Sequence, residues 1–303
     1  MTASVHHQES GHSGIVVAQA SSPQLDYSKV QAYWRRATPS ILGPYMMDGF
    51  GFPACAGRFR FRREQEAVAR TIKSLPSSCS VLDLGSGVGF WTEYFARRFA
   101  NVTSVEASPV LYSALKDRCS RYPNVTICNG DVLSFEPQEK FGLVFLGGLL
   151  MYLNEHDVRV LLERLAPNLE SGALVLCRES TVRRGTKMIR EEYQVVYRCV
   201  ETYRGIFADA GFEVVSAQTN AAYICPQMGC ELVKKWKTLI PQPCWCLPII
   251  GHLAYWGFRI GYPWNTSVIP WLLARIGREF PLLTNHFFVL RPRCPAKGSR
   301  SPT

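Results

Sequence analysis

Three carboxylates follow three successive apolar runs of the chain, at the points where those runs end. Asp83 lies in VLDLGSGVG, Glu106 lies near the end of VTSVEA, and Asp131 ends VTICNGD. An ionised carboxylate only accepts hydrogen bonds, so Glu106 suits the two hydroxyls of a ribose and Asp131 suits the exocyclic amine of an adenine. Three acids at three consecutive strand ends therefore indicate a nucleoside site.

The loop after the first apolar run has glycine at every second position, Gly85, Gly87 and Gly89. Glycine lets the backbone turn tightly and approach a ligand with no side chain between them. The loop begins with Asp-x-Gly, which differs from the dinucleotide-binding fingerprint G-x-G-x-x-G. We therefore expect the loop to hold one nucleoside and not a dinucleotide.

The segments that must position these groups alternate between strand-like and helical patterns from about residue 64 onward. Helices are expected to start at Phe90 and to cover 109–122 and 156–169, where apolar residues recur near helical spacing. This alternation predicts a doubly wound α/β sheet whose ligand lies beyond the carboxyl ends of its strands. Seven strands are expected, over 80–84, 102–107, 125–131, 141–148, 172–180, 212–224 and 286–292.

Together, VLDLGSGVG, Glu106 and Asn-Gly-Asp at 129–131 resemble the Rossmann-like, class I S-adenosylmethionine-dependent methyltransferases, over roughly 76–224. The resemblance implies the seven-stranded sheet of that family and S-adenosylmethionine as the cofactor. It implies that Asp83 orients the loop and the donor's amino group, that the glycines lie against the methionine part, and that Glu106 and Asp131 hold ribose and adenine. The residues expected to contact the cofactor are Trp34, Met46, Asp83, Gly85, Ser86, Gly87, Gly89, Glu106, Ala107, Asp131 and Val132.

The segment 33–51 precedes the sheet and is expected to fold over the donor as a lid. It is similar to the N-terminal segment of the alpha-N-terminal protein methyltransferases, a resemblance that extends over 33–224. The catalytic half of this chain departs from that family. The family's histidine falls on Tyr152, its asparagine falls near Ser180, and its acceptor-binding aspartate falls near Tyr193. These departures disfavour deprotonation of a peptide amine. The positions that match are Tyr33, Trp34, Pro39, Gly43, Met46 or Met47, Gly49, Phe50 and Gly51.

The acceptor side is expected at the ends of strands four and five, with Tyr152, Glu179, Tyr193 and Tyr197 as the catalytic candidates. The segment 188–207 reads as a helix with Tyr193 and Tyr197 on one face, either a core helix or a wall of the acceptor pocket. Methyl transfer needs in-line alignment and exclusion of water, and a sulfur acceptor needs little help from a base.

We therefore expect a small metabolite acceptor, methylated at nitrogen or sulfur. The alternatives are a protein (alpha-N-terminal) or nucleic-acid methyltransferase, and a non-catalytic donor-binding protein.

The segment 225–285 interrupts the expected sheet between strands six and seven and is rich in tryptophan and proline. Pro248, Arg259 and Pro263 interrupt every window of about 20 residues that a spanning helix needs. We expect a cap over the active site, a homodimer surface, or a membrane-surface element with contact through 244–275.

Charge and cysteine usage limit the partners. The formal net charge is +10, but basic and aromatic residues do not alternate as in RNA-binding modules, so nucleic acid is disfavoured. The 11 cysteines are scattered without zinc-ligand spacing, which suits free thiols and no metal site. No secretory signal is recognisable, so the cytoplasm is expected, with a membrane-peripheral alternative.

The remaining regions complete the expected organisation. They are a disordered tail over 1–25, lid helices over 26–75, and a last strand with a basic tail over 286–303.

Overall fold

A computed structural model describes residues 24–37 and 47–293 of the chain, and Met46, Pro39 and Gly43 lie outside the described residues. The helices are α1 (Tyr27–Arg35), α2 (Cys55–Thr71), α3 (Phe90–Ala96), α4 (Pro109–Cys119), α5 (Glu155–Leu165), α6 (Val200–Asp209), α7 (Ala221–Leu239), α8 (Leu247–Ile260) and α9 (Asn265–Arg275). The strands are β1 (Ser80–Leu84), β2 (Asn101–Glu106), β3 (Val125–Asn129), β4 (Phe141–Leu146), β5 (Leu169–Thr181), β6 (Thr186–Arg190), β7 (Gln194–Arg198), β8 (Phe212–Thr219) and β9 (Thr284–Pro292). Short 3-10 turns include η1 (Leu150–Tyr152).

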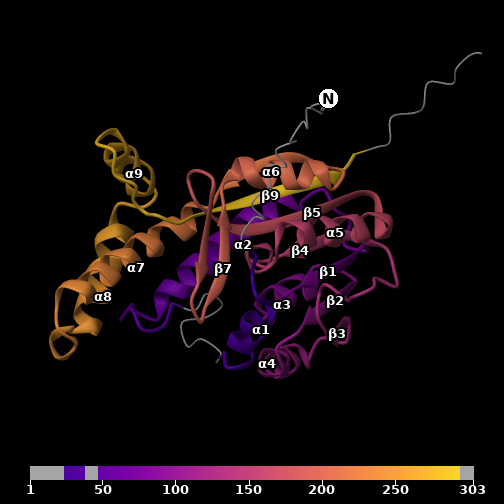
Figure 1. Ribbon diagram of the computed structural model, residues 1–303. Coiled ribbons are helices and arrows are strands. Elements are labelled where there is room, and N and C mark those ends of the chain that lie inside the picture. Colours follow the sequence, from indigo (N-terminus) through magenta and orange to yellow (C-terminus); the bar gives the residue numbers. More distant parts are fainter. Residues whose placement is uncertain (1–23, 38–46, 294–303) are drawn as a thin grey trace, which may run out of the picture.

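Seven of the nine described strands form the main sheet, in the order β3-β2-β1-β4-β5-β9-β8 (Figure 1). The other two, β6 and β7, form a hairpin that pairs with β5 through β7. Strands β1 to β5 run parallel, and β9 is antiparallel to both of its neighbours. Strand order reverses between β1 and β4, which is where a doubly wound sheet opens a crevice for its ligand. The predicted doubly wound α/β fold is therefore confirmed.

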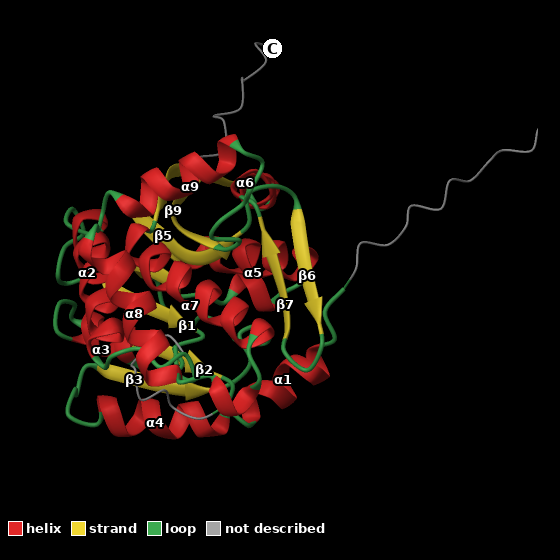
Figure 2. Cartoon of the chain, turned by 90° about the vertical axis from the view of Figure 1, so that its left-hand side faces the viewer, coloured by secondary structure: helices red, strands yellow, loops and turns green. Residues whose placement is uncertain are grey.

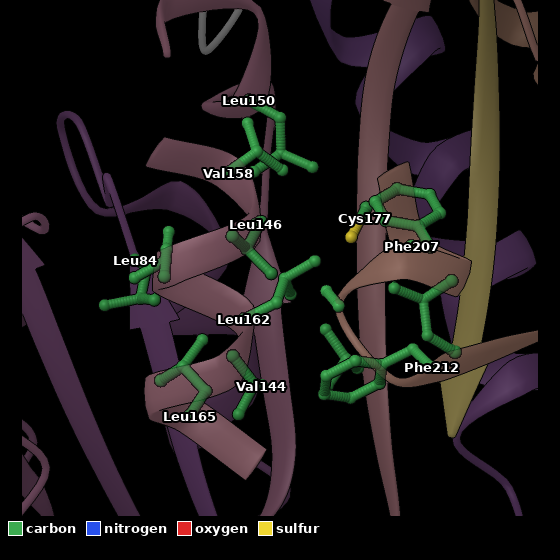
Figure 3. Close-up of a cluster of buried hydrophobic side chains, with 14 of the residues drawn as sticks. Leu84, Val144, Leu146, Leu150, Val158, Leu162, Leu165, Cys177, Phe207 and Phe212 are labelled. Carbon is green, nitrogen blue, oxygen red and sulfur yellow. The ribbon is translucent and has the colours of Figure 1, made fainter. Parts of the chain in front are cut away.

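Helices cover both faces of the sheet because successive strand residues point to opposite sides. In β1, Val81 packs on the side of α2 and α3, whereas Leu82 packs on the side of α5 and α6. Leu162 of α5 and Phe207 of α6 lie in the same buried cluster as Leu82, together with residues of β1, β4 and β5 (Figure 3). This double-sided core fixes the carboxyl ends of the strands along one edge.

Two of the expected elements are wrong in detail. The helix expected over 188–207 is instead the antiparallel hairpin β6–β7 followed by α6, so nine strands are present in the described residues where seven were expected. The run QVVYR is buried throughout and rich in β-branched residues, which favours a strand. The strand expected to reach 224 ends at Thr219, because the Asn220 side chain accepts from the Tyr223 amide and caps α7.

Helix α1 and the β6–β7 hairpin stand over one edge of the sheet (Figure 2). Val30 of α1 and Val196 of β7 belong to a small buried cluster with Leu25, against which Trp34 and Tyr152 pack. The hairpin pairs with β5 at Thr181 and Arg198, and the Arg198 guanidinium donates to the carbonyls of Leu150 and Leu153. The Tyr27 hydroxyl of α1 is bonded to Asp157 of α5. These two elements are therefore held to the core by hydrogen bonds as well as by the small apolar cluster.

The segment between β8 and β9 folds as three helices, α7, α8 and α9, which project from one side of the sheet (Figure 1). A separate apolar cluster joins Phe52 and Ala56, which precede and begin α2, to Val233 of α7 and Tyr255 of α8. Among the helices that the structure describes, none combines the length and hydropathy needed to span a bilayer.

Candidate active site

A cavity of about 750 Å³ lies at the carboxyl ends of the central strands, between the sheet edge and α1. It brings together twelve of the residues expected at the site. Gly89 and Glu179 do not line it, and Met46 lies outside the described residues. The twelve that line it are Trp34, Asp83, Gly85, Ser86, Gly87, Glu106, Ala107, Asp131, Val132, Tyr152, Tyr193 and Tyr197.

Asp83 is the most deeply placed acid of the cavity, with its side chain almost fully buried at the end of β1. Burial raises the pKa of Asp83 to about 7, and the hydrogen bond from Thr92 acts in the opposite direction. The Thr92 hydroxyl donates to Asp83 Oδ2 at 2.6 Å and also contacts the Ser104 hydroxyl. The site thus holds a carboxyl group whose charge would be stabilised by a cationic ligand.

Glu106 joins the glycine loop to the start of α4. Its Oε2 accepts from the Gly87 amide and its Oε1 from the Ser108 amide, both at 2.8 Å. Burial raises the pKa of Glu106, whereas these backbone donors lower it. The Ser108 hydroxyl caps α4 by accepting from the Leu111 amide and donates to the Trp34 carbonyl of α1.

Asp131 lies at the opposite side of the same cavity end. Its Oδ1 accepts from the Leu133 amide at 2.9 Å, and its Oδ2 accepts from the Gln31 side chain of α1 at 3.3 Å. Gln31 also lines the cavity, and sequence reasoning missed it because α1 is distant from β3 along the chain.

The glycine loop owes its shape to left-handed backbone at Gly85, Gly87 and Gly89, with φ of +68°, +58° and +82°. A Cβ on Gly89 would come within 2.5 Å of the Leu115 side chain, so this glycine is required for packing. A Cβ on Gly87 would meet no atom within 4 Å. Gly87 lines the cavity, so its missing side chain leaves space for a ligand.

Aromatic side chains form the other end of the cavity. The ring centroids of Tyr33 in α1 and Tyr193 are 4.9 Å apart. Those of Trp34 in α1 and Tyr152 are 5.2 Å apart. The hydroxyls of Tyr152 and Tyr193 are hydrogen-bonded at 2.7 Å. Burial raises the pKa of Tyr152, Tyr193 and Tyr197 above that of free tyrosine. These hydroxyls therefore stay protonated at neutral pH and act as hydrogen-bond donors, not as bases.

Glu179 lies beneath this aromatic end instead of in it. Its side chain is fully buried, and Oε1 accepts from the amides of Leu149 and Leu150 at 3.1 Å and 3.0 Å. Burial raises the pKa of Glu179 to about 7, while the backbone donors lower it. Because η1 begins at Leu150 and ends at Tyr152, Glu179 holds the turn that presents Tyr152 to the cavity.

Sequence reasoning also missed a charged network in the cavity wall. Glu64 of α2 is fully buried, and its carboxylate pairs with Arg60 at 3.0 Å and Arg178 at 3.7 Å. Both arginines line the cavity. A signal was present, since Arg60 and Glu64 continue the four-residue spacing of Ala56 and Val68 on the buried stripe of α2. Charged residues on such a stripe indicate a polar site facing the core.

Metal ligands do not come together in the part of the chain that the structure describes: no group of three or more histidine, cysteine, aspartate or glutamate side chains is placed to hold an ion. The described cysteines are all free thiols.

Comparisons with known proteins agree with this geometry. Residues 81–172 match the family model described as a methyltransferase domain. An rRNA adenine N-6-methyltransferase of Saccharopolyspora erythraea is 32% identical over 117 residues, which are 38% of this chain and 30% of that protein. Phosphoethanolamine N-methyltransferase 1 of Triticum aestivum is 28% identical over 152 residues, 48% of this chain and 30% of that protein. The chain thus spans 30% of the length of each of these curated relatives.

A solved structure of an S-adenosylmethionine-dependent methyltransferase of Leishmania major has the same fold. It superposes with a TM-score of 0.59 at 15% identity, over 88% of this chain and 82% of that chain. This likeness agrees with the fold class expected from the strand-end motifs.

The buried position of Asp83 generates a prediction about stability. The pKa of Asp83 is about 7 in the folded protein and about 4 in the unfolded chain, so the folded protein binds the proton more tightly. Protonation of Asp83 therefore stabilises the folded protein fully below about pH 4, and this stabilisation is lost as the pH rises through about 7. Relative to Asp83→Asn, the ligand-free wild type should therefore lose unfolding free energy between these values, by at most about 1.4 kcal/mol per pH unit. Urea denaturation of both proteins at a series of pH values measures the difference. Parallel curves would contradict the raised pKa.

Proposed function

We propose that this protein, which carries the methyltransferase domain and the class I fold of S-adenosylmethionine-dependent enzymes, methylates a small metabolite at nitrogen or sulfur. The observation that carries the proposal is the single cavity with two unlike ends. One end presents the carboxylates of Asp83, Glu106 and Asp131, and the other presents a cluster of aromatic side chains. A donor and an acceptor can therefore meet inside one cavity.

The first end fits S-adenosylmethionine by its chemistry and by its shape. When bound, this cofactor supplies a methyl group on a positively charged sulfur. We assign Asp83 to the amino group, Glu106 to the ribose hydroxyls and Asp131 to the adenine amine, since each side chain lines the cavity and can accept hydrogen bonds. The open space beside Gly87 allows the backbone to lie directly against the donor.

The second end would bind and align the acceptor. The tyrosine hydroxyls of Tyr152, Tyr193 and Tyr197 can orient it by donating hydrogen bonds, and the ring faces attract a positively charged centre. Alignment and exclusion of water are the main requirements of the displacement. Since the tyrosines stay protonated and Glu179 does not line the cavity, none of the described side chains at the aromatic end is an evident base. This favours a nucleophile that reacts without one, such as a sulfur or a neutral amine.

Glu179 then acts as a positioning residue and not as a catalytic one. It holds the turn that carries Tyr152 through the amides of Leu149 and Leu150.

A nucleic-acid acceptor is the main alternative, because several curated relatives are rRNA methyltransferases by name. The purified protein should be incubated with methyl-labelled S-adenosylmethionine and an extract separated into small-molecule, protein and RNA fractions. Label in the small-molecule fraction supports the proposed acceptor. Label confined to protein or RNA would overturn the acceptor class while leaving methyl transfer in place, and no label in any fraction would favour a donor-binding protein without activity.

Donor binding should depend on Gly87 and Glu106. Gly87→Val would place a side chain in the donor space, and Glu106→Gln would remove the charged acceptor of the ribose, so each should weaken S-adenosylmethionine binding at least about tenfold by calorimetry. Gly185→Val is the matched control, because Gly185 also has positive φ and free space around its Cβ position, but lies outside the cavity. Wild-type affinity in both site variants would refute the donor assignment.

Acceptor chemistry should depend on Tyr193. Tyr193→Phe removes the hydroxyl bonded to Tyr152 and should lower turnover, while donor affinity stays within about threefold, or below about 1 kcal/mol. Tyr112→Phe, in α4 outside the cavity, serves as the control. Steady-state kinetics on the labelled fraction, together with donor calorimetry, separate the two effects. Unchanged turnover in Tyr193→Phe would remove Tyr193 from the acceptor site.

A further inference from the structure

The outward face of α8 is apolar, which is the reverse of what a helix on a water-exposed surface normally shows. Ile249, Leu253, Trp256 and Ile260 follow one another at intervals of four, three and four residues and are all exposed, Ile260 by 82%. The residues that α8 buries include the small Gly251 and Ala254. It also buries the large Tyr255, so α8 packs through one apolar face and turns a second one, made of the four exposed residues, away from the protein.

Helix α9 repeats the pattern directly after α8. Trp264 at its start is 78% exposed, and Val268, Trp271 and Leu272 follow at helical spacing, all of them exposed. Thr266 is the residue of α9 that the structure buries. The two helices project together from the side of the sheet, as Figure 1 shows. We call the exposed apolar residues of α8 and α9, with Trp264 and Ile276, the α8–α9 face. An apolar surface of this kind marks an interaction site.

Basic residues outnumber acidic ones around the α8–α9 face. Residues 231–279 contain six lysine or arginine residues and two glutamates, Glu231 and Glu279. The guanidinium of Arg275 lies 3.9 Å from the centroid of the Trp271 ring, so cationic and apolar groups share the same surface. The six cationic residues are Lys234, Lys235, Lys237, Arg259, Arg275 and Arg278.

We infer that the α8–α9 face binds the surface of an anionic lipid bilayer, with both helices lying in the interface. Exposed tryptophans, large aliphatic side chains and flanking cations are the combination that inserts into the boundary between headgroups and acyl chains. Each cation near an anionic leaflet adds attraction that decreases with salt. Since no described helix can span a bilayer, contact is limited to its surface.

A second copy of the chain is a poorer occupant of this face. Two such surfaces placed together would oppose six cations with six cations, and the two bordering glutamates, of which Glu231 already accepts from the amides of Leu282 and Leu283, are too few to pair with them. An anionic surface satisfies both the apolar and the charged groups. The inference is independent of the proposed function, because it concerns a surface and not the cavity.

Vesicle flotation with the full chain tests the inference. The protein should float with vesicles of phosphatidylcholine containing about 30 mol % phosphatidylglycerol at about 0.15 M salt, much less with phosphatidylcholine alone, and less at about 1 M salt. The double variant Ile260→Ser/Trp264→Ser should reduce the bound fraction at least about tenfold, since it removes the two most exposed apolar side chains quoted above.

The matched control is Val110→Ser/Val215→Ser, which removes two exposed valines, from α4 and β8, outside the α8–α9 face. Circular dichroism and thermal unfolding verify that both variants fold. Absence of flotation with anionic vesicles, or equal flotation of the double variant and wild type, would overturn the inference. A dimer in light scattering that the double variant dissociates, without vesicle binding, would assign the face to a second copy instead.

Discussion

One buried carboxylate connects the parts of the site that come from different regions of the chain. Glu106 receives the amide of Gly87 on one oxygen and the amide of Ser108 on the other. Ser108 in turn begins α4 and donates to the carbonyl of Trp34 in α1. A carboxylate buried this deeply is costly unless it is hydrogen-bonded, so the loop, α4 and α1 must keep their places together. The shape of the donor end thus follows from satisfying one acidic side chain.

The donor end was predictable because its groups lie at fixed places within local motifs. Asp83 and Glu106 lie at the ends of β1 and β2 and Asp131 follows β3, and parallel strands that are neighbours bring their ends to one edge. The sheet itself was predictable for the same reason, since each strand and helix has its own periodicity in sequence. Errors arose where two periodicities agree, because residues four apart, such as Tyr193 and Tyr197, would share a face in a helix and also in a strand. In the structure Tyr197 lies in β7 and Tyr193 lies in the turn before it, and both line the cavity although the expected helix is absent.

Other parts of the cavity wall depend on contacts between residues far apart in sequence, and these left little signal. Gln31 reaches Asp131 from α1 across 100 positions, and Glu64 of α2 meets Arg178 of β5. No local pattern relates such partners. Only the spacing of Arg60 and Glu64 on an otherwise apolar stripe indicated that α2 contributes charge to the interior. Glu179 illustrates the opposite case, where a strand-end acid serves a neighbouring turn instead of the cavity.

The way α1 is attached has a consequence for timing. Its buried cluster with the hairpin contains Leu25, Val30 and Val196, and hydrogen bonds of Tyr27, Gln31 and the Trp34 carbonyl hold it to α5, the loop after β3 and α4, so its separation from the sheet would disrupt less apolar packing than opening the main core. With α1 in place, the cavity has a wall on that side, and a ligand bound there is shielded from solvent. Catalysis in this cavity would therefore alternate between a closed period, when the reactants are aligned, and an open one, when they exchange. The frequency of that exchange would then set an upper limit on the turnover rate. Such a limit responds to solvent viscosity and not to the strength of the nucleophile.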